Sequence, residues 1–353
     1  MNNFKQLILL SLVALVVSCG DKSGEADAPE ALIRLVAQVE TEPVASNEDA
    51  ADDPAIWINQ ANPSQSRILG TNKQQGLLVY NLLGLELQRI DRGRLNNVDV
   101  RQNVALGDTQ RDIAVATNRT HSSLDVFAIE ENGYVRWLME QPLNFSDPYG
   151  VCLYHDKTGN LFAFVNDKSG AYQQWQILAP KGPLKLELMR EFATASQPEG
   201  CAADDASGIL YVGEESTGVW QMSADPQVNT EMSLVADVRD GALTADVEGI
   251  DIYRKGNDTA YLVVSSQGSN RYVIYDLLDD NRLRGSIALV DHPNGRVDGT
   301  QETDGLAVTS VALGEEFPQG ILVVQDGINT LPNANQNFKI VDWALIKERL
   351  KLR

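Results

Sequence analysis

Short stretches of alternating apolar and polar residues recur along the chain, separated by turn-forming residues. Each unit begins with a polar anchor, continues through a first apolar strand and a second strand with a polar end, and closes with a third strand that carries aromatic residues. The anchors are 43 to 56 residues apart: Asp53, Asn96, Tyr149, Glu199, Glu248 and Asp304. Units of about 50 residues built from short strands are typical of propeller blades. The pattern predicts an all-β, six-bladed β-propeller that forms one domain over residues 33–353.

Two flanking segments complete this fold. Residues 33–42 alternate in polarity and are expected to supply a strand that closes the last blade, so that the ring leaves no exposed edge. Residues 343–352 have helical periodicity and predict a short amphipathic helix. A β-sandwich with a similar number of strands is the alternative, but it does not explain a polar anchor at the same phase of every unit.

The N-terminus has the pattern of an export signal. Residues 7–17 form an apolar run after Lys5, too short to span a bilayer, and Cys19 follows it. We expect residues 1–18 to be a lipoprotein signal peptide, Cys19 to be lipidated, and residues 19–32 to be a flexible tether. Gly20 favours the outer membrane, with the lipid as the only membrane attachment. A plain signal peptide and a buried apolar helix remain alternatives.

Charge and composition narrow the chemistry. The 353 residues carry a formal net charge of −20, which argues against nucleic acid as a partner. With only three His and no HExxH motif, a His-bound zinc site is not expected, so a metal would be held by oxygen atoms.

The anchors suggest where such a metal binds. The innermost strands of a propeller line its channel, so residues at one phase of every blade converge at one mouth. Four anchors are carboxylates, further acids lie beside them, and clustered acids repel one another unless a cation intervenes. Oxygen ligands without His or thiolate favour Ca²⁺. The Gly that follows most anchors is expected to allow a tight entry into the strand, and Asn97 to tolerate left-handed geometry in its place.

The ends of the second strands add an asymmetry. Units one to three end in Lys73, Arg119 and Lys168, whereas units four and six end in Glu215 and Asp326. A rim that is half cationic and half acidic suits a polyphosphorylated ligand, because cations bind phosphate oxygens directly and metal ions bridge the remaining oxygens to the acids. The alternative is that these cations form solvated salt bridges.

The remaining two thiols are expected in an oxidising compartment. Cys152 lies three residues after its anchor and Cys201 lies two after its own. Period-2 alternation would then point them to opposite strand faces, so we favour two small buried residues over a disulfide, which remains the alternative.

Several stretches, in order, resemble the β-propeller phytases of bacteria: DAADDPAIW (49–57), TNKQQGLLVY (71–80), EGCAADD (199–205), DVEGIDIY (246–253) and DGTQETDG (298–305). The resemblance runs from Glu40 to about Trp343. It implies a six-bladed propeller that binds several calcium ions and hydrolyses phosphate monoesters of myo-inositol hexakisphosphate (phytate), taken as a calcium complex.

The resemblance also implies residue roles. Phosphate contacts, which are also catalytic, would be Lys73, Arg119, Tyr149 and Lys168, with Glu215 as a further catalytic residue. Calcium ligands at the mouth would be Asp52, Glu199, Glu215, Asp246, Glu248 and Asp304. A structural calcium would use Asp53, Asp298 and the carbonyls of Pro54 and Val98, and a further calcium would involve Glu40, Asp326 and Asn329. Many members carry an acid where this chain has Ser169, so the mouth of this chain carries one negative charge fewer.

The expected mechanism is hydrolysis by a metal-activated water without a covalent enzyme intermediate. The chain lacks the RHGxRxP sequence of phosphatases that use a His nucleophile. A calcium-dependent lactonase or esterase and a non-catalytic propeller that binds polyanions are the alternatives. We expect a monomer.

Overall fold

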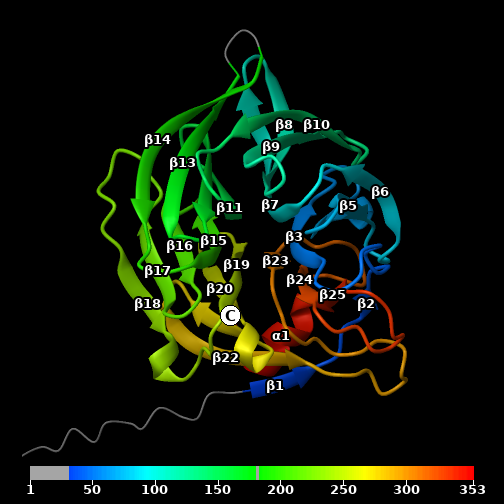
Figure 1. Ribbon diagram of the computed structural model, residues 1–353. Coiled ribbons are helices and arrows are strands. Elements are labelled where there is room, and N and C mark those ends of the chain that lie inside the picture. The colour runs from blue at the N-terminus through cyan, green and yellow to red at the C-terminus, as the bar shows by residue number, and fades with distance from the viewer. Residues whose placement is uncertain (1–31, 180–182) are drawn as a thin grey trace, which may run out of the picture.

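The computed structural model describes residues 32–179 and 183–353, which form six sheets arranged in a ring (Figure 1). Five sheets have four strands and one has five, and within each blade consecutive strands pair antiparallel. The six-bladed propeller prediction is therefore confirmed. The expected signal peptide, Cys19 and all of the expected tether except Leu32 lie outside the described residues.

Each blade runs from an inner strand outward. Blade one holds β3 (Ala51–Trp57), β4 (Arg67–Asn72), β5 (Gly76–Tyr80) and β6 (Glu86–Asp91). Blade two holds β7 (Leu95–Leu106), β8 (Thr109–Asn118), β9 (Ser123–Ile129) and β10 (Val135–Pro142). Blade three holds β11 (Pro148–His155), β12 (Leu161–Asp167), β13 (Ala171–Leu178) and β14 (Lys185–Ala193).

The second half of the ring repeats this order. Blade four holds β15 (Pro198–Asp204), β16 (Ile209–Glu214), β17 (Gly218–Ser223) and β18 (Ser233–Asp237). Blade five holds β19 (Val247–Lys255), β20 (Thr259–Ser266), β21 (Arg271–Asp276) and β22 (Arg282–Leu289). Blade six holds β23 (Leu306–Thr309), β24 (Ile321–Asp326) and β25 (Asn337–Asp342). Short 3₁₀ turns cover Pro63–Gln65, Val238–Asp240 and Gln267–Ser269.

The N-terminal segment closes the ring in two places. β2 (Val39–Glu40) pairs antiparallel with β25 and supplies the fourth strand of blade six, as expected. β1 (Leu32–Leu35) instead pairs parallel with β22 and adds a fifth strand to blade five. The expectation that all of residues 33–42 would close one blade was thus wrong in part, because the chain crosses between two neighbouring blades at residues 36–38.

The C-terminal helix α1 (Trp343–Leu350) confirms the prediction of a short helix there. The Asp342 carboxylate caps it by accepting a hydrogen bond from the Ala344 amide at 2.9 Å. The helix buries Trp343, Ile346 and Leu350, and the Trp343 ring stacks on Tyr253 at 4.1 Å between centroids. Among the described residues, no helix has both the length and the apolar character needed to cross a membrane.

A β-bulge at the equivalent position of five inner strands explains why the anchors face the mouth. In β3, β7, β11, β15 and β19 the pairing with the second strand skips two residues, and the anchor is one of the two. A bulge releases the residue from the ladder and re-aims its side chain. At five of the six polar anchors the ladder between the inner strand and the second strand is therefore interrupted, and it resumes on both sides of the bulge.

The glycines after the anchors have a different role from the one expected. Gly200 lacks a positive φ, and so does Asn97 in blade two. A Cβ on Gly200 would lie 2.1 Å from the Glu248 carbonyl oxygen, and one on Gly150 would lie 1.9 Å from the Glu199 carbonyl oxygen. The glycines are required because neighbouring inner strands approach closely, and not because of left-handed backbone.

Candidate active site

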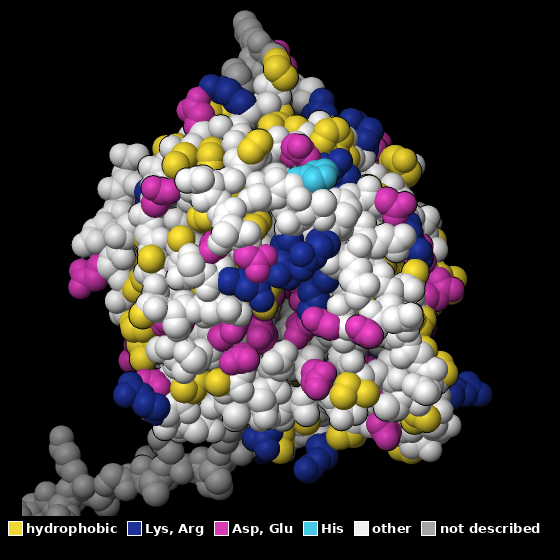
Figure 2. All heavy atoms as spheres, viewed as in Figure 1, with side chains coloured by type: hydrophobic (Ala, Val, Ile, Leu, Met, Phe, Trp, Pro, Cys, Tyr) yellow, Lys and Arg dark blue, Asp and Glu magenta, His cyan; other side chains and the backbone are white. Residues whose placement is uncertain are grey.

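One face of the ring carries a mouth where acidic and basic side chains gather side by side (Figure 2). A cavity of about 660 Å³ opens there. Its lining includes the predicted site residues Lys73, Tyr149, Glu215, Asp246, Glu248, Asp304 and Asn329. Residues from equivalent parts of five blades thus line one cavity.

Three glutamates form the centre of the acidic part. Glu199, Glu215 and Glu248 each offer a carboxylate oxygen, and these oxygens lie within 4.8 Å of one another. We call these three residues the acid trio. All three are buried, so their mutual repulsion is weakly screened.

Burial and the repulsion of nearby carboxylates raise the pKa values of Glu248, Glu215 and Asp304. Burial, followed by the charge of Glu199, raises the pKa of Glu248 well above its usual range. Burial raises the pKa of Glu215 to about 7, although a hydrogen bond from Gln197 opposes the shift. Burial likewise raises the pKa of Asp304 to about 6, against the opposing charge of Lys73. These carboxylates are therefore destabilised as anions unless a cation compensates them.

The donor set fits a divalent cation. Glu248 Oε2 and Asp52 Oδ2 are buried carboxylate oxygens without a hydrogen-bond partner among the described residues. Buried polar atoms in native proteins are nearly always satisfied. Converging carboxylate oxygens with free lone pairs are the ligands that hard cations such as Ca²⁺ prefer.

Lys73 lies within the acidic part of the mouth. Its Nζ is 2.6 Å from Asp49, 3.1 Å from Asp304 and 3.4 Å from Asp52. Burial lowers the pKa of Lys73, but the charges of Asp52 and Asp304 outweigh burial and raise it. The ammonium is thus held protonated at the edge of the cavity. We expected all three cations on one half of the rim and the acids on the other. Arg119 and Lys168 lie together beside Tyr149, as expected. Lys73, in contrast, lies among the acids.

Tyr149 sits between the two other predicted cations. The Nζ of Lys168 lies 4.0 Å above the Tyr149 ring, and the Arg119 guanidinium lies 5.8 Å from it. Burial and the charges of Glu199 and Glu248 raise the pKa of Tyr149, so its hydroxyl stays protonated as a donor. These three side chains offer positive charge and a hydrogen bond at one rim.

Asn96 connects the basic rim to the acid trio. It donates from Nδ2 to Glu199 Oε1 at 2.9 Å and accepts from Arg119 Nη1 at 3.2 Å. Because one amide orients both groups, the positions of the Glu199 carboxylate and the Arg119 guanidinium are coupled.

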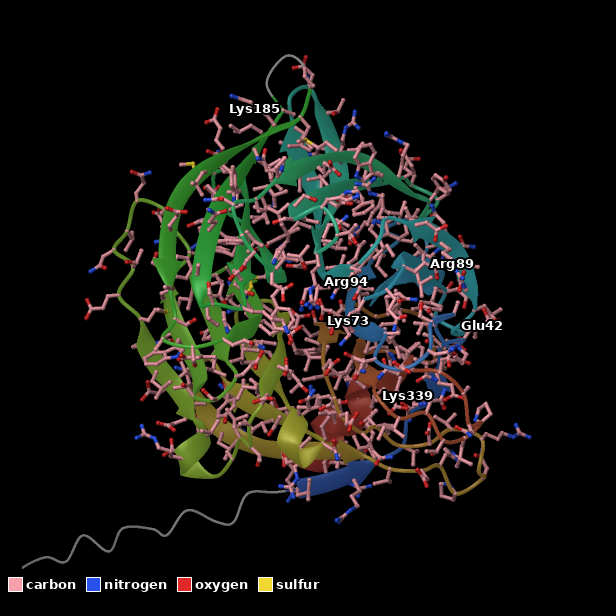
Figure 3. All side chains as sticks on the ribbon, viewed as in Figure 1. Glu42, Lys73, Arg89, Arg94, Lys185 and Lys339 are labelled. Carbon is pink, nitrogen blue, oxygen red and sulfur yellow. A yellow bond between two sulfur atoms is a disulfide. The ribbon has the colours of Figure 1, made fainter. Side chains whose placement is uncertain are left out.

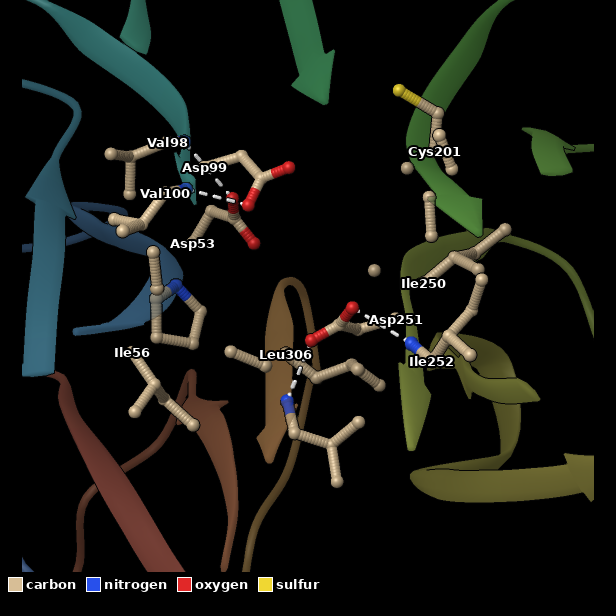
Figure 4. Close-up of a pocket in the computed structure, with 18 of the residues that line it drawn as sticks. Asp53, Ile56, Val98, Asp99, Val100, Cys201, Ile250, Asp251, Ile252 and Leu306 are labelled. Carbon is tan, nitrogen blue, oxygen red and sulfur yellow. Dashed lines mark hydrogen bonds between the residues drawn. The ribbon is translucent and has the colours of Figure 1, made fainter. Parts of the chain in front are cut away.

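A second cavity, of about 370 Å³, lies in the channel and is lined by Asp53, Pro54 and Val98 (Figure 4). Asp53 Oδ2 accepts a hydrogen bond from the Val98 amide at 3.0 Å. Three of the four residues expected at a structural calcium therefore lie together. The fourth, Asp298, belongs to a different cluster.

That cluster surrounds Lys339, which is fully buried. The Lys339 Nζ lies 2.6 Å from Glu40, 2.5 Å from Asp298 and 3.2 Å from Asp326. Asn329 Oδ1 is buried and has no hydrogen-bond partner in the described chain. The structure thus places Asp298 with Glu40 and Asp326, around an internal cation.

The expectation that Cys152 and Cys201 are unpaired was wrong. They form a disulfide, with 5.6 Å between their Cα atoms, that joins β11 of blade three to β15 of blade four. The face argument failed because the two strands belong to neighbouring blades and not to one sheet. Adjacent blades pack face to face, so side chains on opposite faces of consecutive blades meet.

Sequence reasoning missed the polar residues that hold the site residues in place. Asp147 accepts from Arg119 Nε at 2.8 Å and from Nη2 at 3.0 Å, and Gln197 donates to Glu215 at 2.6 Å. Gln267 donates to Asp304 at 2.6 Å. Asp147 and Gln197 each precede an anchor by two residues, a phase that was visible in the repeat.

Comparisons by sequence show which family this chain resembles. The family model described as Phytase matches residues 5–352. A 3-phytase from Bacillus subtilis (strain 168) is 40% identical over 354 residues, which cover 97% of this chain and 91% of that protein. A functionally unknown protein from Desulfotomaculum acetoxidans DSM 771 has a TM-score of 0.46 and 16% identity, covering 66% of this chain and 70% of its own.

The fold and the mouth define a class: a β-propeller enzyme whose buried carboxylates can hold a metal beside cations that bind anions. The extent of both sequence matches narrows the class further. The chain belongs to the phytase family.

Proposed function

We propose that this protein is a calcium-dependent phytase that hydrolyses phosphate monoesters of myo-inositol hexakisphosphate. One observation carries the proposal. In a chain that belongs to the phytase family, Lys73, Tyr149 and two members of the acid trio line a single cavity, and Glu199 completes the trio beside it. Such a cavity places side chains that donate hydrogen bonds to phosphate oxygens beside carboxylates that can ligate a metal.

The mouth cation would be held by the trio together with Asp52, Asp246 and Asp304. When bound, it supplies positive charge to phosphate oxygens and lowers the pKa of water. Calcium suits the site because all donors are oxygens and its coordination geometry is loose. A further calcium site is proposed at Asp53 with the carbonyls of Pro54 and Val98. The calcium expected at Glu40, Asp326 and Asn329 is not proposed, because the Lys339 ammonium already lies among Glu40, Asp298 and Asp326.

The chain's own residues bind and orient the substrate. The Lys73 ammonium and the Tyr149 hydroxyl donate to oxygens of the phosphate that is cleaved, while Arg119 and Lys168 bind a neighbouring phosphate. Water attacks phosphorus in line, the new P–O bond forms as the bond to the inositol oxygen breaks, and solvent protonates that oxygen. The proton of the attacking water passes to solvent, and the Glu215 carboxylate would act by helping to hold the cation.

Phosphate release from calcium phytate by the purified protein tests the proposal. We expect release that requires calcium, loss of at least 100-fold in Glu215→Gln and Lys73→Ala, and full activity in the exposed control Glu231→Gln. Hydrolysis of lactones or carboxylic esters without phosphate release would favour the lactonase alternative. Binding of phytate without turnover would favour a polyanion-binding module, and either result would refute the phytase proposal.

We further propose that the protein is a monomer anchored to the outer membrane by a lipid on Cys19. The Cys152–Cys201 disulfide supports an oxidising compartment outside the cytoplasm. Expression of the full chain with Cys19→Ser should move it from the membrane fraction to the soluble fraction. Equal membrane association of both forms would contradict the lipid anchor.

A further inference from the structure

Exposed apolar side chains gather at the outer edge of blades one and two. Among the described residues, the four most exposed large apolar residues, with exposed fractions of 65, 54, 51 and 49%, are Leu83, Tyr134, Leu87 and Leu85. The three leucines lie in the turn between β5 and β6 and at the start of β6, the outermost strand of blade one. Tyr134 lies in the turn before β10, the outermost strand of blade two. We call these four residues the apolar edge.

Hydrogen bonds between the two blades hold the two parts of the apolar edge side by side. The Gln88 side chain donates to the Val135 carbonyl at 2.7 Å and accepts from the Val135 amide at 2.9 Å. Leu87 and Tyr134 are the chain neighbours of these two residues, so they lie at the same edge of the ring. Apolar residues that are exposed singly are common on soluble proteins, whereas a cluster of them marks an interaction surface.

A groove next to the leucines enlarges this apolar surface. It has a volume of about 540 Å³, and its apolar lining consists of Leu82, Leu83, Leu87, Leu313 and Phe317. The charged residues that line it are Arg67, Glu315 and Glu316. Because acids outnumber bases there, the groove favours an uncharged apolar partner over an anionic one.

The N-terminal segment of the protein lies against the same edge. The Glu42 amide donates to the Gly84 carbonyl at 2.8 Å, so the turn that carries Leu83 packs on the chain just after β2. Figure 3 shows Glu42 and Arg89, which lies on β6, at the outer edge of the ring, whereas Lys73 lies near its centre.

The length of chain before β1 limits how far this side can lie from a membrane. The chain from Cys19 to Leu32 reaches at most about 45 Å, and a compact domain of this size is about 50 Å across. A lipid on Cys19 would therefore keep the N-terminal side of the ring close to the bilayer.

We propose that the apolar edge is a membrane-contact surface, whose leucines and tyrosine enter the interface of the bilayer that holds the lipid anchor. This inference rests on the anchor proposed above for Cys19. Leucines partition into the boundary of the acyl chains, and tyrosine favours the level of the headgroups. A weak apolar contact suffices, because the anchor makes it the second of two linked binding events. The ring then stands on its edge, and the mouth at its centre stays open to dissolved substrate.

A fluorescent probe at position 83 tests this contact in the full, lipidated chain. With Cys19 lipidated and Cys152 bonded to Cys201, Leu83→Cys introduces the only free thiol, which is labelled with the environment-sensitive dye nitrobenzoxadiazole. In phosphatidylcholine vesicles we expect its emission to shift to the blue and to be quenched by lipids that carry spin labels on their acyl chains. Replacing Leu85 and Leu87 by Ser in the same chain should return the probe to water.

Val228→Cys is the matched control. Val228 is exposed by 48%, close to the value for Leu85, but it lies between β17 and β18 of blade four. A probe there should remain in water on the same vesicles. Equal quenching at positions 83 and 228, or no quenching at position 83 while the chain is bound to the vesicles through its lipid, would refute the contact and leave the anchor standing.

If the full chain carries no lipid, the anchor proposal fails, and sedimentation of that chain with phosphatidylcholine vesicles decides the contact alone. Burial of a half-exposed leucine is worth about fivefold in partition, so Leu83→Ser combined with Leu87→Ser should lower the partition coefficient about 25-fold, and Val228→Ser should leave it unchanged. Equal sedimentation of the parent and the leucine variant, including none of either, would refute the contact. A dimer in lipid-free solution that the leucine substitutions abolish, measured by light scattering, would assign the surface to a second copy of the chain and overturn the proposal.

Discussion

Without bound metal, the protein should lose stability as the pH rises through neutrality, and Glu215 allows the effect to be measured. Its pKa is raised from 4.5 to about 7 in the folded chain, chiefly by burial. An acid with a raised folded pKa binds more protons in the folded state than in the unfolded state between these values. Its contribution to stability is complete below pH 4.5 and is lost as the pH rises through about 7.

The magnitude follows from linkage. With these two pKa values, the contribution of Glu215 to the free energy of unfolding falls by about 2.5 kcal/mol between pH 5 and pH 8. Other buried acids titrate over the same range, so the difference between two variants isolates Glu215. In Glu215→Gln the decrease between pH 5 and pH 8 should be about 2.5 kcal/mol smaller than in the wild type.

Urea unfolding of chelator-treated protein at several pH values measures this difference, and Glu231→Gln, which removes an exposed carboxylate, is the control. With saturating calcium the trend should reverse, because metal binding requires deprotonated ligands and becomes stronger as the pH rises. Parallel pH profiles for the wild type and Glu215→Gln in chelator would refute the argument that burial of this carboxylate is costly.

Three further results are expected. Chelation should lower the melting temperature, and calcium should restore it, because a ligand at 100 times its Kd adds about 2.7 kcal/mol for each site; an unchanged melting temperature would contradict a structural role of the metal. Lys73→Met should destabilise the chelated protein by about 3 kcal/mol, since it leaves Asp52 and Asp304 buried without their cation, and an unchanged urea midpoint would count against that ion-pair network. Replacing Cys152 and Cys201 by Ser should cost about 4 kcal/mol, as the bond closes a loop of 49 residues, and a wild-type urea midpoint in the double variant would refute this.

The sequence could predict the ring and the mouth because both depend on the phase of a repeat. A polar residue at the start of every inner strand is visible in a single sequence, and ring closure brings equal phases together. Asp53, Glu199 and Glu248 were located in this way, and the structure shows that each is released from the ladder by a bulge.

Contacts between blades could not be predicted from alternation within one strand. The Cys152–Cys201 bond joins two sheets, and its geometry depends on how one blade face meets the next. The parallel pairing of β1 with β22 and the position of Asp298 beside Lys339 likewise join segments that are distant in sequence. Period-2 patterns state which residues share a face but not which neighbouring face they meet.

The acid trio and the carboxylates around Lys339 differ in how their negative charge is compensated. This difference indicates that the trio is the site where a metal would bind. Lys339 is buried among three carboxylates, so an internal ammonium compensates that cluster. Lys73 contacts Asp49, Asp52 and Asp304, and no Lys or Arg of the described residues forms an ion pair with the acid trio. The burial of three neighbouring carboxylates therefore costs electrostatic free energy at the trio, which a bound external cation would offset. Because the same cation would serve hydrolysis, metal affinity, folding stability and activity should rise and fall together in variants of the trio, whereas variants of the Lys339 cluster should alter stability with a smaller effect on turnover.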